Sequence, residues 1–332
     1  MLESSAIKIK RGTLLDTLVP AADSHRPLVL TPTEDIRGFL TLHLGRAALF
    51  LVTCTSVLAV FLIFLFVIRE ALPFLAKFSI KEFLTSTAWY PEAVTPKFGT
   101  LALLVGSGYV TVVSIIFAVP VGILAAVFLS DIVSMKIRNI IKPIIEILAA
   151  IPSVAYGFFA VMVLAPWMQQ KFGFSTGTNA LNASLVLAVM ALPTIISVSE
   201  DSISAIGREL REASYGCGAT RMETIFKVVI PAAHSGIIAG IVLGMMRAIG
   251  ETMVVWMASG NAAQIPSPWW DLSQSVRTLT ATIAGDMGET EKGSPHYRAL
   301  FAAGLLLLVI TLCLNMVSEY FLIRAKKAGG KH

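Results

Sequence analysis

Six long apolar stretches dominate the sequence and restrict what the chain can fold into. They cover residues 47–68, 99–129, 144–166, 181–199, 233–258 and 297–323. Each is long enough to cross about 30 Å of hydrocarbon as an α-helix. Only 14% of the 332 residues are charged, against about 25% in soluble domains. We therefore expect an all-α integral membrane protein with six transmembrane helices.

The second stretch is unusually long and contains Gly106, Gly108, Pro120 and Gly122. Dividing it there would leave two segments that are each too short to cross the membrane. We expect a single helix that tilts or continues into the cytoplasm.

The distribution of lysine and arginine predicts the orientation of the chain. One side of the membrane receives 17 of these residues and the other receives eight. Cytoplasmic segments carry the excess of positive charge, so both termini are expected in the cytoplasm. The net charge of +5 is then a matter of membrane orientation, and no nucleic-acid partner is expected. The cytoplasmic segments are 1–46, 130–143, the loop within 200–232 and the tail after 324, and the external ones are 69–98, 166–180 and 259–298.

The expected organisation has four parts. Residues 1–46 form a cytoplasmic tail, which is either partly disordered or a docking arm. Residues 47–98 form the first transmembrane helix and an external segment. Residues 99–324 form the permease core with the cytoplasmic loop 200–232, and residues 325–332 form a second cytoplasmic tail.

The loop between the fourth and fifth apolar stretches has an unusual internal order. Glu212, Ala213 and Ser214 are followed three residues later by Gly218, and Pro231 closes the segment. The spacing predicts a short helix over 208–215, a reversal that glycine permits, and a second short helix. Proline suits the start of the next long helix because its missing N–H is not needed there. Such a loop forms a rigid projection to which another protein can bind.

The fifth apolar stretch contains two charged residues. Arg247 is near the middle of 233–258, and Glu251 follows one helical turn later. An arginine at the centre of a membrane helix costs about 2.5–3.5 kcal/mol on insertion scales. We expect an ion pair between the two side chains. That pair is either structural, or it lines a path in which the guanidinium offers parallel donors to an oxyanion.

No motif for catalysis or for nucleotide binding occurs in the chain. The sequence lacks a GxxxxGK[ST] loop, an HExxH pair and a GxSxG elbow. Its three cysteines have no metal-ligand spacing. We expect no enzymatic activity, no metal and no cofactor bound by this chain, so ATP and Mg²⁺ belong to a separate subunit.

Two sets of residues resemble those of ABC importer permeases. The loop from Glu212 to Pro231 resembles the EAA loop of type I importers, with Ser214 in place of the second alanine. The stretch RAIGETM from Arg247 is similar to the signature of phosphate permeases of the PstC type. The segments 98–100, 118–122, 150–154, 260–261, 277–280 and 296–301 add to this resemblance.

The resemblance implies a MetI-like permease fold in a bacterial inner membrane. It implies three protein partners: a second homologous permease subunit of the A type, an ATPase dimer and an external phosphate-binding protein. Membrane lipid surrounds the permease itself. Arg247, Glu251 and Thr252 would line the phosphate path, and the loop residues Glu212, Ala213, Ser214, Gly218 and Pro231 would couple to the ATPase. The alternatives are an importer of molybdate or sulfate and, as a different class, a secondary transporter.

The predicted orientation can be tested with reporter fusions. Fusions at Gly173 and Gly285 should report an external location, and fusions at Ser134 and after His332 should report the cytoplasm, because of the charge asymmetry. A cytoplasmic signal at Gly285 would exclude the six-span arrangement.

Overall fold

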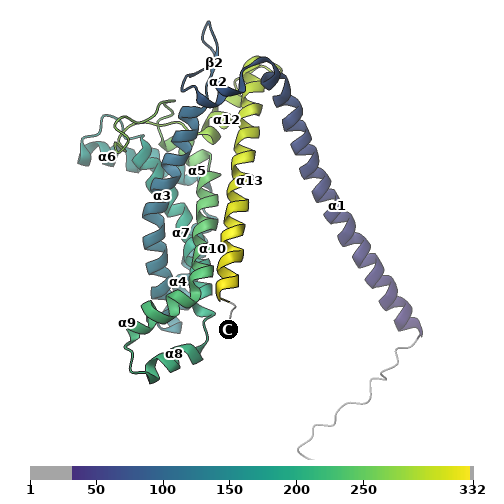
Figure 1. Ribbon diagram of the computed structural model, residues 1–332, viewed down its shortest axis with the longest axis vertical. Coiled ribbons are helices and arrows are strands. Elements are labelled where there is room, and N and C mark those ends of the chain that lie inside the picture. The colour runs from purple at the N-terminus through teal and green to yellow at the C-terminus, as the bar shows by residue number, and fades with distance from the viewer. Residues whose placement is uncertain (1–31, 330–332) are drawn as a thin grey trace, which may run out of the picture. The chain divides into compact units, whose positions relative to one another are not determined.

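The protein is described by a computed structural model that covers residues 32–329 (Figure 1). It divides at Ile63 and Phe64 into two units. In the described part of the first unit, the chain is helical throughout and belongs to α1 (Pro32–Lys77). This helix begins well before the predicted start at residue 47, and the rest of the predicted tail, 1–31, lies outside the described residues.

The second unit is a helical bundle centred on α7 (Ala180–Ser204). This helix packs against α3 (Leu101–Val127) and α10 (Ile230–Ile249), and α10 in turn packs against α13 (Pro295–Gly329). Figure 1 shows these four helices side by side. As expected, the second apolar stretch is one long helix, because α3 continues through the π-helical turn η1 (Phe128–Ile132).

Three glycines allow α7 and α10 to pack closely. Gly236, Gly240 and Gly244 recur every four residues on α10, so they share one face. A Cβ atom on Gly236 would lie 1.9 Å from Ser202 Oγ, and one on Gly244 would lie 2.5 Å from Ile195 Cγ1. In lipid, where hydrophobic burial no longer drives association, small residues permit the van der Waals contact that holds helices together. The glycine face therefore fixes the contact between these two helices.

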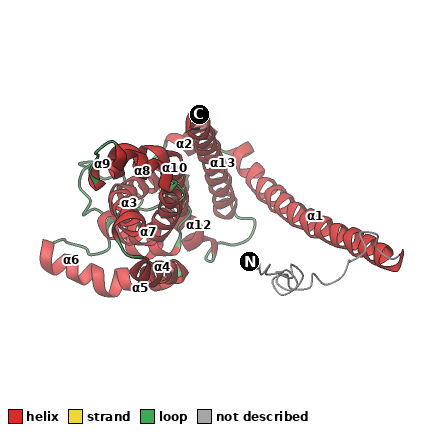
Figure 2. Ribbon diagram, turned by 90° about the horizontal axis from the view of Figure 1, so that it is seen from below, coloured by secondary structure: helices red, strands yellow, loops and turns green. Residues whose placement is uncertain are grey.

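The third predicted span, 144–166, is wrong as a straight helix. The structure has α4 (Met135–Ala150), then α5 (Ser153–Phe159), the π-turn η2 (Ala160–Leu164) and α6 (Ala165–Phe172). The two halves meet at a bend of 88°. Pro152 lacks an N–H and holds Ile151 in an extended conformation, which ends α4. Figure 2 shows α5 and α6 extending sideways from the bundle.

The fifth predicted span, 233–258, is also interrupted. Its helix begins earlier, because α9 (Arg221–Thr224) and the π-turn η3 (Ile225–Val229) run without a break into α10. It also ends earlier, at Ile249, and the short helix α11 (Met253–Ala258) follows after Gly250, Glu251 and Thr252. The single-helix prediction failed because the break at 250–252 lies inside a mostly apolar run, and apolar composition alone does not reveal an interruption.

The number of apolar helices agrees with the expected six spans when the bent pair is counted as one. Among the described residues, five helices are long and apolar enough to cross a membrane by themselves. They are His43–Lys77, Leu101–Ile132, Ala180–Ser204, Arg221–Ile249 and Pro295–Met316, and the bent pair consists of Met135–Ala150 and Ser153–Phe172.

A small layer covers the ends of α3 and α13. It contains α2 (Ile80–Thr85), the paired strands β1 (Trp89–Tyr90) and β2 (Lys97–Phe98), and α12 (Leu279–Met287). Ser79 and Thr278 cap α2 and α12 by accepting hydrogen bonds from backbone N–H groups. A core of mostly aromatic and leucine side chains holds the layer: Phe74, Phe83, Trp89, Phe98, Leu103, Leu279 and Leu300.

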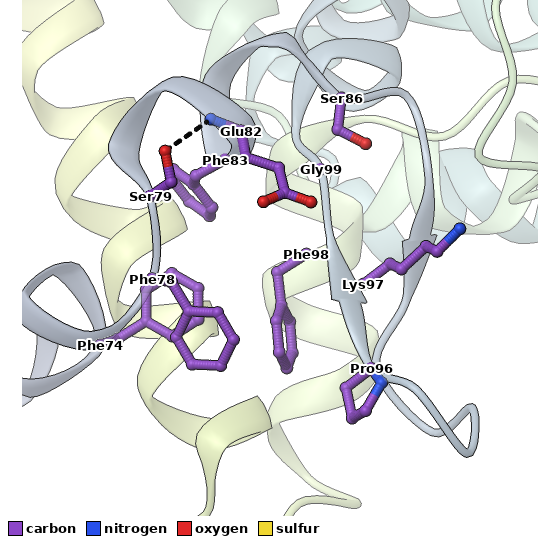
Figure 3. A pocket seen from close by; sticks show the side chains of 10 residues that line it. All are labelled: Phe74, Phe78, Ser79, Glu82, Phe83, Ser86, Pro96, Lys97, Phe98 and Gly99. Atoms are coloured by element: carbon purple, nitrogen blue, oxygen red, sulfur yellow. Dashed lines mark hydrogen bonds between the residues drawn. The ribbon is translucent and has the colours of Figure 1, made fainter.

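A cavity of about 240 Å³ lies in this layer, and Figure 3 shows the side chains that line it. The rings of Phe74, Phe78 and Phe98 contact one another within it, with centroid separations of 4.6–5.3 Å. The Glu82 carboxylate lies above these rings in the view of Figure 3. None of the predicted site residues lines this cavity, so we do not assign the transport site to it.

Candidate functional site

Arg247 lies in the last turn of α10, where that helix stops. Its guanidinium Nη2 donates a hydrogen bond to the backbone carbonyl oxygen of Ala149, at 3.3 Å. Ala149 lies in the last turn of α4, directly before the bend at Pro152. The arginine therefore joins the two interrupted helices at the points where both are broken.

The end of α4 is a favourable place for a positive charge. The last four carbonyl groups of a helix have no partner inside it, and they carry the negative end of the helix dipole. Arg247 takes one of these carbonyls, and the Tyr156 hydroxyl donates to another, that of Leu148, at 2.9 Å. The half-buried guanidinium thus has a hydrogen-bond acceptor and further N–H groups for an anion.

The expected ion pair between Arg247 and Glu251 is not present among the described residues. The prediction assumed an unbroken helix, in which residues four apart share a face. Because α10 ends at Ile249, Glu251 leaves that helical register. What holds the segment instead is its backbone: the carbonyl oxygen of Glu251 accepts a hydrogen bond from Thr280 Oγ1 at 3.0 Å.

Hydroxyl groups surround the break on the side of Glu251. Together with Glu251 they line a cavity of about 10 Å³, a volume on the order of one water molecule. Thr252, the third predicted path residue, directs its hydroxyl to the Gly250 carbonyl at 3.4 Å. The hydroxyl-bearing residues of the cavity are Ser107, Thr111, Thr278 and Thr280.

The loop between α7 and α10 has the predicted form. Its first helix is α8 (Arg208–Gly216), and the chain reverses at Gly218, whose φ is +83°. The second helix, α9, begins at a capping box in which Thr220 and Glu223 bind each other's backbone N–H groups. Unlike the prediction, this second helix runs directly into the long one, and Pro231 lies at the start of α10 within that run.

The predicted coupling residues lie on the exposed part of this loop. Glu212, Ala213 and Gly218 are exposed, and Ser214 bonds through its hydroxyl to Thr224 Oγ1 at 2.9 Å. No residue of α8 is buried. The loop is therefore accessible to a partner over most of its surface.

Sequence reasoning missed the ionic contacts that fix the loop and its surroundings. The buried Glu200 of α7 pairs with Arg138 and with Lys142 of α4, the latter at 2.8 Å. Asp131, at the end of η1, pairs with Arg211 of α8. The available signal was a cluster of acids and bases at the ends of apolar stretches, but nothing in it states which residues meet.

Comparison with known proteins identifies the family to which the chain belongs. Residues 118–327 match the family described as "Binding-protein-dependent transport system inner membrane component". A probable ABC transporter permease protein, YqgH of Bacillus subtilis, is 41% identical over 74% of this chain and 78% of its own length. The phosphate transport system permease protein PstC of Mesorhizobium japonicum is 36% identical, over 73% and 78% respectively.

The chain belongs to the binding-protein-dependent transport permeases. Solved members of ABC importers share its fold at low identity. A chain of a bacterial ABC transporter involved in the import of alginate matches with a TM-score of 0.58 at 16% identity, covering 86% of this chain and 98% of its own. A chain of the methionine transporter MetNI matches at 0.52 and 20% identity, covering 67% and 96%.

Membership of this permease family confirms several expectations. The chain is a multi-pass inner-membrane protein with the type I importer fold. It is the membrane subunit of a transport system, in which the partners are an ATPase and a substrate-binding protein.

The loop geometry gives a test at Gly218. Its φ of +83° is a conformation in which a β-branched side chain is strained by about 1–3 kcal/mol. Gly218→Val should leave the permease in the membrane and reduce ATP-driven uptake severalfold, because the loop no longer keeps its conformation. Uptake per amount of membrane-inserted protein is the measurement.

Gly207 provides the matched control. It precedes α8 with a φ of −57° and has open space around it, so Gly207→Val should transport far better than Gly218→Val. Equal uptake in the two variants would show that the loop conformation is unimportant.

Proposed function

We propose that this chain is a permease subunit of an ATP-driven importer of inorganic phosphate. Several relatives carry the name phosphate transport system permease PstC, including proteins of Mesorhizobium japonicum and Pasteurella multocida. The chemistry of the site supports the same substrate, because phosphate is a tetrahedral oxyanion with one to two negative charges. A guanidinium recognises such an anion with two parallel N–H donors.

The observation that carries the proposal is the position of Arg247 between two broken helices. Transporters place substrate sites at discontinuous helices, where backbone groups are free to interact. Arg247 contacts α4 through a single neutral acceptor at 3.3 Å, and no carboxylate neutralises it among the described residues. An arriving phosphate would supply that counter-charge. Glu251 and Thr252 complete the path in this proposal, from the segment that follows the break.

Coupling to ATP hydrolysis takes place at the loop. A separate ATPase dimer, which holds ATP and Mg²⁺, binds the loop through a surface that includes Glu212, Ala213 and Ser214 of α8 and Gly218 after it. Helix α9 runs through η3 into α10, with Pro231 inside that run, so movement of the loop reaches the helix that carries Arg247. The loop and both termini face the cytoplasm in this arrangement, as the basic residues indicate.

Two further partners complete the proposed transporter. One chain offers one such loop, whereas an ATPase dimer offers two sites, so a second homologous permease of the A type forms the other half of the pore. A phosphate-binding protein delivers the anion to the external segments.

The second candidate substrate is another oxyanion, molybdate or sulfate, because a guanidinium binds these as well.

Substitution of Arg247 tests the proposed path. Arg247→Gln keeps a polar side chain with N–H donors but removes the charge, so phosphate uptake should fall by about tenfold or more. Arg247→Lys keeps the charge and loses the planar fork, so part of the activity should remain. Uptake is measured in proteoliposomes and normalised to the assembled complex recovered by pull-down, with excess sulfate or molybdate as competitors.

Lys136→Gln serves as the control, since Lys136 is an exposed base in the first turn of α4, outside the external segments and the loop helices. It should transport as the unmodified complex does. Unchanged uptake in Arg247→Gln would mean that the arginine only caps α4. Stronger inhibition by sulfate or molybdate than by unlabelled phosphate would assign the other substrate.

A further inference from the structure

The loop helix α8 is held to the bundle mainly by polar contacts. None of its residues is buried, so apolar packing contributes little to its position. It is joined through the chain to α7 and α9 and lies beside η3. Its polar side-chain contacts with other helices come from Ser214, which bonds to Thr224 of α9, and from Arg211. Arg211 donates to the Ile203 carbonyl of α7 at 2.9 Å and pairs with Asp131.

Asp131 receives arginines from both helices of the loop. Arg211 of α8 donates to its carboxylate, and Arg221 of α9 donates to its backbone carbonyl oxygen. The Asp131 side chain is only 7% exposed, and that of Arg211 is 19% exposed. Such a shielded, charge-assisted contact is stronger than an exposed ion pair, which contributes about 0–1 kcal/mol.

Asp131 also lies at one end of a continuous helix that reaches the anion site. The run from Leu101 to Ile132 has 32 residues, which corresponds to about 48 Å at 1.5 Å per residue. Near its other end, Ser107 Oγ accepts a hydrogen bond from the N–H of Leu279, at 2.9 Å. The next residue, Thr280, is the one that binds the Glu251 carbonyl beside Arg247.

We propose that Asp131 is the positioning residue that couples movement of the cytoplasmic loop to α3, and through α3 to the external side of the anion site. This proposal rests on the proposed function of the loop as the ATPase contact. With Asp131 in place, α3 moves together with α8 and α9. Without it, the loop still moves α7 and α10 through the chain, and α3 follows only through its packing against these two helices.

The test compares transport with ATP hydrolysis in the full reconstituted complex. Asp131→Asn removes the charge that holds Arg211 and keeps the size of the side chain. The number of substrate molecules transported per ATP hydrolysed should fall by about fivefold or more. A purely structural role would instead lower the amount of assembled complex and leave this ratio unchanged.

Two further variants separate positioning from folding. The exchange of Asp131→Arg with Arg211→Asp restores opposite charges and should recover much of the ratio. The control is Asp201→Asn, which breaks an ion pair with Lys142 on the same side of the bundle but does not involve α8. Its ratio should match that of the unmodified complex.

A distance measurement makes the test independent of the substrate. One spin label is placed on the exposed Cys217, after α8, and another at Phe128→Cys on η1, with Cys54 and Cys313 replaced by serine. On ATP binding, this distance should stay constant in the unmodified protein and change by several ångströms in Asp131→Asn.

The outcomes separate the two proposals. An unmodified complex that imports no phosphate would contradict the proposed substrate, and the label distances would still test Asp131. A normal transport ratio with an unchanged distance in Asp131→Asn overturns the role of Asp131. So does a complex that fails to assemble in Asp131→Asn and is not recovered by the charge exchange.

Discussion

The hydrogen bond from Arg247 to the Ala149 carbonyl is the contact on which the rest of the site depends. It joins the end of α10 to the end of α4, and both helices are broken there. Within hydrocarbon, every backbone polar group needs a partner inside the protein or in a water-filled cavity. A cation at the end of α4 supplies a partner for the carbonyl groups there. It also places a positive charge at the point where the two helices are interrupted.

The surroundings of this contact follow from the same requirement. Thr280 satisfies the Glu251 carbonyl, and Tyr156 satisfies that of Leu148. The bundle beneath the site is closely packed through the glycine face of α10 against α7. We infer that the packed helices transmit movement. We also infer that the anion path opens at the interrupted segments, which side-chain hydroxyls hold in place.

Much of this fold could be predicted from the sequence, because long apolar runs and a glycine reversal depend on local physics. The six stretches, the loop helices and the conformation of Gly218 are of this kind. The breaks at Pro152 and Gly250 were missed because apolar composition alone does not distinguish a straight helix from an interrupted one. The contacts of Arg247 and Asp131 join segments far apart in the chain, so spacing could not reveal them.

The most direct measurement is a structure of the assembled importer trapped with phosphate in the membrane subunits. Arg247 should leave the Ala149 carbonyl and lie within about 2.7–3.0 Å of a phosphate oxygen, the distance of a charge-assisted hydrogen bond. A phosphate bound elsewhere in the pore, with Arg247 still on Ala149, would contradict it.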